Sequence, residues 1–391
     1  MTQSAKIVSP ARRAAIAPFI AMDVKRESSL LEQAGAGIVH MEVGEPSAPP
    51  PRRAREAAIA ALAGQPVGYT DALGLSSLRE RIARHYRVTY AVEVDPQRVA
   101  VTTGSSGGFI MAFLALFDAG ARVAIQNPGY PAYRNIFGAL GIEAVDLPVD
   151  SSNSFAVTAA AVERADDAHK LDGLLLMSPA NPTGAMQSPE SLRQIAETCE
   201  KRGIKFISDE IYHGLTYDQP AQTALAFSDR ALIVNSFSKY YCMTGWRVGW
   251  LVVPPELIRT VERLQQSLAI SAPTLSQIAA EAAFEATDEL EAIKAGYGRN
   301  RDILLNGLRG LGLDQLAPAD GAFYLYADVS RFTDDSTAFC HDLLHRAGVA
   351  ATPGVDFDPV RGHLALRLSY AGAEADMVEA LKRLKTFLAR R

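Results

Sequence analysis

The sequence predicts an α/β protein, with a large domain built on a mostly parallel, seven-stranded sheet between helices and with a smaller α+β domain. Two observations predict this class. Short apolar runs rich in β-branched residues alternate with helical patterns through the middle of the 391-residue chain, which is the order of βαβ units in a parallel sheet. Toward the C-terminus, longer helical patterns surround two strand-like runs, which is typical of a separate α+β layer.

Seven runs are predicted as strands of the large sheet, because each is short, apolar and bounded by small or polar residues. They are Arg98–Thr103, Arg122–Gln126, Ala144–Pro148, Gly173–Met177, Lys205–Ser208, Ala231–Asn235 and Gly249–Val253. Helices are predicted between some of them, at Gly107–Phe117 and Pro189–Lys201. Ser188 is a favourable N-cap for the second helix, and Pro189 suits its first turn.

The remaining patterns divide the chain into a large domain over residues 49–290 and a smaller domain over residues 291–391. In the smaller domain, helices are predicted at Leu304–Leu311, Ser336–Ala347 and Ala373–Ala389, and strands at Ala322–Asp328 and His363–Ser369. The proline-rich stretch Pro46–Pro51 predicts an extended connection into the large domain.

The composition is that of an ordinary globular protein, with 48% hydrophobic and 21% charged residues. A net charge of −5 gives no reason to expect nucleic acid or an anionic membrane as a partner. Three widely spaced cysteines form neither a zinc pattern nor a disulfide framework. No apolar run is long enough to span a bilayer, and the N-terminus lacks the apolar core of a signal peptide, so we expect a cytoplasmic protein.

The strongest functional signal is Lys239, in Ser236-Phe237-Ser238-Lys239, with Arg247 eight residues later. A lysine attacks an aldehyde only as the neutral amine, so a lysine in this role needs a pKa below its free value of about 10.4. Arginine stays charged and can hold a phosphate through two parallel hydrogen bonds. We expect Arg247 to be buried. Together these residues predict a site for pyridoxal phosphate.

Further polar residues follow predicted strands, which is where ligands bind in open α/β sheets. After the first strand come Gly104, Ser105 and Ser106, where glycine lets the backbone approach a phosphate and a helix N-terminus supplies N–H groups. Asn181 follows Gly173–Met177, and its amide can point at a ligand oxygen. Taken singly, each motif also fits an ordinary turn.

Asp209 ends another strand, where a buried acid is costly unless it is paired. A protonated pyridine nitrogen would be such a partner and would make the ring an electron sink. Tyr212 could then reach the phenolic oxygen of the ring, and Tyr130 could stack on its face. Arg367, on a C-terminal strand, is suited to clamp a carboxylate. Singly, these residues also fit a helix cap, core tyrosines and a surface arginine.

Together the motifs resemble the class I/II aminotransferases, the fold-type-I pyridoxal-phosphate enzymes. The matching elements are Tyr69-Thr-Asp-Ala-Leu-Gly, residues 104–108, Pro128-Gly-Tyr-Pro, Asn181-Pro-Thr-Gly, Ser208-Asp-Glu-Ile-Tyr, Ser236-Phe-Ser-Lys, Gly245-Trp-Arg-Val-Gly, Gly321-Ala-Phe-Tyr and Leu366-Arg-Leu-Ser. They span almost the whole chain in the order of the family. The resemblance implies transfer of the amino group of an L-amino acid to a 2-oxo acid by a ping-pong mechanism, with aspartate, alanine or aromatic amino acids as possible substrates.

The resemblance also implies a role for each residue. Lys239 would form the Schiff base and shuttle the proton, Asp209 would pair with the pyridine nitrogen, Tyr212 and Asn181 would bind the 3′ oxygen, and Tyr130 would stack on the ring. Ser105, Ser106, Ser236, Ser238 and Arg247 would surround the phosphate. Tyr69 would reach the phosphate of a neighbouring subunit, which implies a homodimer with shared sites. Arg367 would bind the substrate carboxylate, Gly44 would lie against the substrate, and residues 1–48 would join the smaller domain.

Four alternatives remain at this point. A C–S β-lyase on the same fold would use the same lysine. A serine hydrolase would use Ser106, because residues 104–108 match the pattern of a nucleophile elbow. A metal enzyme would use His341 and His345, but the sequence shows no third ligand and we expect no metal site. A transcription regulator would need a DNA-binding module for which the chain has no room.

Overall fold

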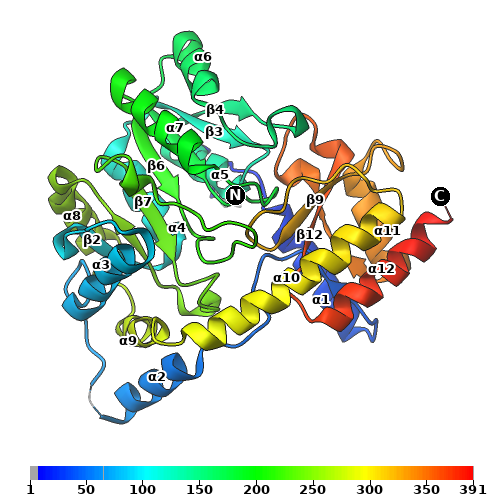
Figure 1. Ribbon diagram of the computed structural model, residues 1–391, viewed down its shortest axis with the longest axis horizontal. Coiled ribbons are helices and arrows are strands. Elements are labelled where there is room, and N and C mark those ends of the chain that lie inside the picture. The colour runs from blue at the N-terminus through cyan, green and yellow to red at the C-terminus, as the bar shows by residue number, and fades with distance from the viewer. Residues whose placement is uncertain (1–7, 65, 391) are drawn as a thin grey trace, which may run out of the picture.

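The computed structural model describes residues 8–64 and 66–390 and confirms the predicted class (Figure 1). In this part of the chain, seven strands form the central sheet in the order β2-β8-β7-β6-β5-β3-β4. They are β2 (Val99–Thr102), β3 (Arg122–Asn127), β4 (Glu143–Pro148), β5 (Gly173–Met177), β6 (Lys205–Asp209), β7 (Leu232–Ser236) and β8 (Gly249–Val252). β8 runs antiparallel to its neighbours β2 and β7, and the other pairs are parallel.

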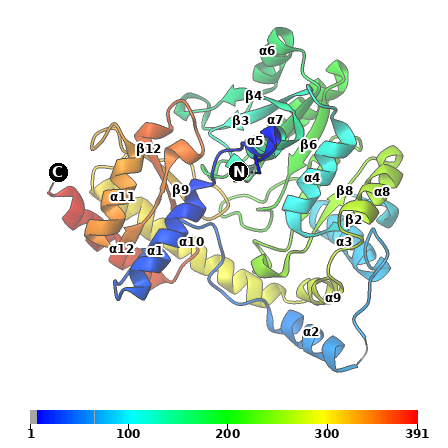
Figure 2. The same ribbon diagram turned by 180° about the vertical axis from the view of Figure 1, so that it is seen from behind.

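Helices cover both faces of this sheet (Figures 1 and 2). Leu174 and Leu176 of β5 point into one hydrophobic core and Leu175 into the other, because successive side chains of a strand face opposite sides. The first core includes residues of α2 (Arg52–Gly64), α3 (Ser76–Tyr90), α6 (Ala159–His169), α7 (Pro189–Arg202) and α9 (Thr274–Ala283). The second includes residues of α4 (Gly104–Leu116), α5 (Pro131–Leu140) and α8 (Ile258–Leu268).

The start of α4 differs from the prediction. The helix begins at Gly104 rather than Gly107, although glycine and serine are poor helix formers. Phe109 and Phe113, one turn apart, are buried against the sheet, and this packing outweighs the local preference. Ser105 and Ser106 therefore lie in the first turn of a helix, where backbone N–H groups are free for a ligand.

The smaller part of the molecule surrounds a three-stranded antiparallel sheet in the order β11-β12-β9. These strands are β9 (Tyr324–Asp328), β11 (Thr352–Pro353) and β12 (Ala365–Ser369). The helices packed with it are α10 (Thr287–Gly310), α11 (Ser336–Ala347) and α12 (Glu374–Leu388). The N-terminal segment joins it, because β1 (Val39–His40) pairs in parallel with β10 (Val349–Ala350).

One helix links the two parts of the chain, and another packs on the smaller part. α10 runs through the predicted boundary at residue 290: Leu290 packs in the first core of the large sheet, and Leu304 packs in the core of the smaller part. The domain limits therefore stay a prediction. α1 (Ile20–Gln33) lies beside the smaller sheet, and Asp356 accepts hydrogen bonds from the backbone of Ile20 and Ala21 at its start (Figure 2). Among the described residues, no helix combines the length and apolar character needed to cross a membrane.

Candidate active site

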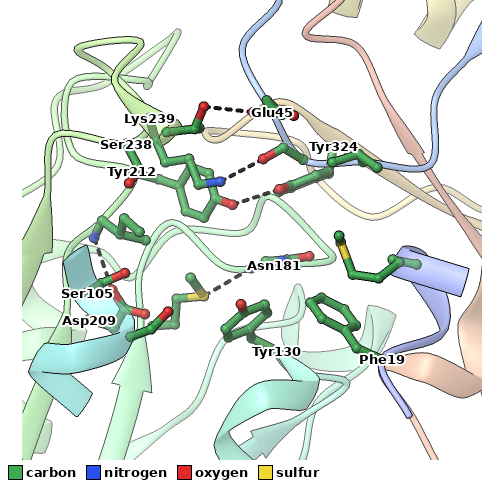
Figure 3. Close-up of a pocket in the computed structure, with 18 of the residues that line it drawn as sticks. Phe19, Glu45, Ser105, Tyr130, Asn181, Asp209, Tyr212, Ser238, Lys239 and Tyr324 are labelled. Carbon is green, nitrogen blue, oxygen red and sulfur yellow. Dashed lines mark hydrogen bonds between the residues drawn. The ribbon is translucent and has the colours of Figure 1, made fainter. Parts of the chain in front are cut away.

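A cavity of about 520 Å³ lies at the carboxyl ends of the large-sheet strands (Figure 3). One wall consists of residues that follow β2, β5, β6 and β7, and the other comes from α1, the loop after β1, β9 and β12. Of the residues predicted from the sequence, ten side chains and Gly44 line it. These are Ser105, Ser106, Tyr130, Asn181, Asp209, Tyr212, Ser238, Lys239, Arg247 and Arg367. The structure thus brings together residues from most of the length of the chain.

Lys239 lies three residues beyond the end of β7, and its amine points into the cavity (Figure 3). Its Nζ donates to the carbonyl oxygen of Gly44 over 2.6 Å. Burial lowers the pKa of Lys239 to about 8, and the positive charge of Arg367 acts in the same direction. A substantial fraction of this amine is therefore neutral near physiological pH, as a nucleophile or proton acceptor requires.

Asp209 is the last residue of β6 and is 1% exposed. Its carboxylate accepts hydrogen bonds from the hydroxyl of Tyr133 and from the backbone of Ile211, the latter over 3.1 Å. Burial raises the pKa of Asp209 to about 7, against the effect of these hydrogen bonds. A buried acid that lines a cavity is stabilised in its charged form when a cation comes next to it.

Three tyrosines border the space between Asp209 and Lys239. The hydroxyls of Tyr212 and Tyr324 lie 2.7 Å apart, and both residues are buried (Figure 3). Tyr130 precedes α5 and makes edge-to-face contacts with Phe19 and Tyr133. Each ring offers an aromatic face or edge against which a planar ligand can pack.

The guanidinium of Arg247 lies against the start of α4. A Cβ on Gly104, whose φ is +71°, would lie 2.5 Å from a guanidinium nitrogen of Arg247, so glycine allows this close approach. The expectation that Arg247 is buried is wrong: it lines the cavity but is exposed to solvent. It is held there by a hydrogen bond from its Nη1 to the carbonyl oxygen of Thr244 over 2.9 Å.

Two predicted residues lie outside the lining. Ser236 is buried one layer behind Ser238, and its Oγ donates to Ser238 Oγ over 2.9 Å. It supports Ser238 rather than facing the cavity, because its own side chain points back toward the carbonyl of Val248. Tyr69 is 83% exposed and does not line the cavity of its own chain. Its role across an interface stays a prediction.

Arg367 is 2% exposed, so it is not the surface arginine that its strand position alone would suggest. Its Nη1 donates to Asn181 Oδ1 over 2.9 Å and its Nη2 donates to the carbonyl of Glu42. The guanidinium lies over the ring of Tyr324, 4.4 Å from its centroid. Its Nε has no hydrogen-bond partner among the described residues. A buried cation with an unused donor at a cavity wall is suited to an anionic ligand group.

Sequence reasoning missed part of the lining. Tyr324 lines the cavity and belongs to a motif noted above but received no role. Tyr133 does not line the cavity, but its hydroxyl donates to Asp209 from the first turn of α5, and no motif marked it. Phe19 and Met22 come from the N-terminal segment, where no motif marks them. His341, His345 and His363, which a serine hydrolase would need beside Ser106, do not line the cavity.

Comparison with known proteins decides the family. The model for the family "Aminotransferase class I and II" matches residues 36–384. The chain belongs to this family. A valine–pyruvate aminotransferase of Mycobacterium tuberculosis is 49% identical over 382 residues, which cover 97% of this chain and 98% of the relative.

Solved aminotransferase structures agree with this assignment. One aminotransferase from Mycobacterium tuberculosis is similar with a TM-score of 0.96 at 48% identity, covering 98% of this chain and 100% of the other. The aspartate aminotransferase of Thermus thermophilus with maleate is similar with a TM-score of 0.92 at 30% identity, covering 97% and 100%. The protein is therefore a pyridoxal-phosphate-dependent aminotransferase.

The residues of this aminotransferase fit pyridoxal phosphate. The approach of Arg247 to Gly104 at the start of α4 provides charge and N–H groups for a phosphate. Asp209, buried and raised in pKa, provides the acid that a protonated ring nitrogen would stabilise. Lys239 provides an amine of lowered pKa that lines the same cavity.

Proposed function

We propose that this aminotransferase transfers the amino group of a neutral, apolar L-amino acid to a small 2-oxo acid such as pyruvate, in ping-pong order. The observation that carries the proposal is the charge of the cavity wall. Among the described lining residues, the cationic side chains are Lys25, Lys239, Arg247 and Arg367. Each of the four already has a partner or an expected role: Lys25 pairs with Glu45, and the other three are assigned to the cofactor or to the α-carboxylate. None is left to bind a second carboxylate on the substrate side chain.

Lys25 lines the cavity from α1, and it forms an ion pair with Glu45 over 3.2 Å. Glu45 also accepts a hydrogen bond from Thr244 over 2.7 Å. Although burial opposes the shift, these hydrogen bonds from Thr244 and Lys25 lower the pKa of Glu45. Lys25 is thus neutralised by an ionised partner, and the surrounding surface of Phe19, Met22 and Tyr130 is apolar. The name of the valine–pyruvate aminotransferase relative supports the same class of substrate.

When bound, pyridoxal phosphate supplies an electrophilic carbon and an electron-withdrawing ring. Asp209 would favour a proton at the ring nitrogen by offering it a buried negative charge. Ser105, Ser106, Ser238 and Arg247 would hold the phosphate. Tyr212 and Asn181 would hold the ring oxygen, and Tyr130 would pack against the ring.

The remaining residues act on the amino acid. Arg367 binds its α-carboxylate, and the bond from Arg367 to Asn181 fixes the guanidinium in place. Lys239 takes the proton from the α-carbon and returns a proton on the cofactor side. The Gly44 carbonyl orients the lysine amine for this transfer. A Cβ on Gly44 would lie 1.6 Å from the hydroxyl of Tyr324, so the approach of this loop requires glycine.

We also propose a homodimer in which Tyr69 reaches the phosphate site of the second chain. In support, Tyr69 is 83% exposed, and α2 exposes Ile59 and Leu62 at 66% and 64%. α2 lies at the edge of the molecule (Figure 1), where a second copy would cover these apolar side chains. Sedimentation of the holoenzyme as a monomer at micromolar concentration would contradict the proposal. The cytoplasmic location stays a prediction.

The test of function is the visible absorbance of the holoenzyme after addition of one L-amino acid without a 2-oxo acid. We expect L-valine or L-alanine to bleach the cofactor band, and pyruvate to restore it. A faster response to L-aspartate than to L-valine would contradict the substrate class. Release of pyruvate and ammonia from cysteine conjugates, with no restoration by pyruvate, would favour the β-lyase instead.

A further inference from the structure

A second group of chemistry-bearing residues lies outside the active site, between α1 and α11. His341 and His345 occupy positions i and i+4 of α11 and therefore share one helix face. Their rings lie 4.3 Å apart between centroids, with an angle of 32° between the planes. The sequence showed no third metal ligand, but the structure provides a candidate: the carboxylate of Glu27, on α1, faces both imidazoles.

The geometry of the three side chains converges on one point. The Nε2 of His345 is 2.7 Å from Oε1 of Glu27, and the Nε2 of His341 is 3.9 Å from the same oxygen. The three candidate ligand atoms all lie within 4.8 Å of one another. Around a tetrahedral zinc ion with ligand bonds of about 2.0–2.1 Å, neighbouring ligand atoms are about 3.3 Å apart. Small side-chain rotations reach this spacing, since all three residues are partly or fully exposed.

A simple ion pair explains this arrangement less well. An ion pair needs only one imidazole, yet two Nε2 atoms approach the same oxygen of Glu27. Imidazole and carboxylate ligands together suit Zn²⁺ and its neighbours in the first transition row, and they suit Ca²⁺ or Mg²⁺ poorly. Three protein ligands leave a fourth position for water.

We propose that Glu27, His341 and His345 bind a divalent transition-metal ion, with Zn²⁺ as the ligand to test. The ion would connect α1 to α11. α1 also supplies Met22 and Lys25 to the wall of the active-site cavity, so the metal would restrain that wall without contacting substrate. This site is independent of the transamination chemistry, because none of its three ligands lines the cavity.

The experiment is a Zn²⁺ titration of untagged, chelator-treated holoenzyme in competition with a chromogenic zinc indicator, with no amino acid present. We expect one Zn²⁺ per chain. Loss of an outer-shell partner of a zinc ligand costs about 10–100-fold in affinity, so His341→Ala, His345→Ala and Glu27→Gln should each weaken binding about tenfold or more. All three side chains are accessible to solvent, so these variants should fold.

Two matched controls come from the same chain. His363→Ala removes an exposed histidine elsewhere, and Glu32→Gln removes a carboxylate of α1 that pairs with His40 instead. Both should bind Zn²⁺ like the wild type. Absence of stoichiometric binding, or equal affinity in the wild type and both histidine variants, would overturn the proposal. Retained Zn²⁺ binding in a variant without transaminase activity would still support it, so this test is separate from that of the proposed function.

Discussion

The two walls of the cavity are built differently. The wall at the sheet edge holds single polar groups aimed at the cavity, such as Asp209, Ser238 and Lys239. Asp209 is the last residue of β6, and Ser238 and Lys239 follow the end of β7 by two and three residues. The opposite wall, from the N-terminal segment and the smaller sheet, is apolar at Phe19 and Met22.

The difference reflects two tasks. A cofactor has the same polar groups in every turnover, so its wall can consist of fixed partners on rigid strand ends. Under the proposed function, a substrate wall would accept one carboxylate and otherwise exclude charge. Arg367 as a buried cation and the ion pair of Lys25 with Glu45 fit that task. This comparison predicts that substitutions in the first wall lower cofactor affinity and kcat, whereas substitutions in the second change which amino acid is preferred.

The largest effect should come from Lys239→Ala. The variant loses both the nucleophilic amine and the proton carrier, so kcat should fall by about 10⁴-fold or more. The measurement is the rate of amino transfer from L-valine to pyruvate by the variant and by the wild type. Full turnover by this variant would mean that the first wall has another base.

Asp209→Ala should have the next largest effect, because it removes the charge partner of the ring nitrogen from a dry site. We expect kcat/KM to fall by about 10²–10³-fold, on the scale of a lost preorganised electrostatic contact. Asp209→Asn, of similar volume, is the matched control for packing and should show a similar loss. Near wild-type rates in both would show that Asp209 only caps the local turn at Ile211.

The two arginines should separate the walls. Arg247→Ala should raise the dissociation constant of pyridoxal phosphate more than Arg367→Ala does, because Arg247 lies at the start of α4. Arg367→Ala should raise the KM of the amino acid by about 10²-fold, as expected for loss of a charge-assisted bidentate contact of about 2–3 kcal/mol. Fluorescence titration gives the dissociation constant of pyridoxal phosphate, and steady-state kinetics gives KM. If Arg367→Ala weakened cofactor binding more and Arg247→Ala raised KM more, the two roles would have to be exchanged.

The pH dependence of cofactor uptake should report the environment of Lys239. Only the neutral amine reacts with an aldehyde, and its fraction rises with pH through the pKa. Because burial lowers the pKa of Lys239 to about 8, the rate at which the apoprotein takes up pyridoxal phosphate should increase about tenfold from pH 6 to pH 7 and level off above pH 9. A rate that keeps rising toward pH 10.4, the value for a free lysine, would mean that the amine is exposed to water.

The smallest effect should come from Met22→Lys, which places an unpaired cation on the substrate wall. An exposed charge pair contributes up to about 1 kcal/mol, so the ratio of kcat/KM for L-aspartate over L-valine should rise about fivefold. Met22→Leu is the control and should leave the ratio unchanged. No change in the lysine variant would show that substrate side chains do not approach α1.

The residues of the first wall were predictable from the sequence because they stand at the ends of recognisable strand patterns. Parallel strands present their carboxyl ends at one edge of the sheet, so Asp209 at the end of β6 and Asn181 after β5 were expected near one another. Ser236 shows the limit of this reasoning: its motif is correct, but the turn places it behind Ser238. The exposure of Arg247 was likewise not predictable, because it depends on how far the cavity opens.

The sequence by itself determined the α/β class, the strands of the large sheet and the identity of the lysine, because these follow from short-range patterns of apolar and polar residues. The tertiary structure alone decided that α4 begins at Gly104, that Tyr133 meets Asp209 and that Glu27 faces His341 and His345. These contacts join segments far apart in the chain, and their energies come from burial and packing, which no local pattern records.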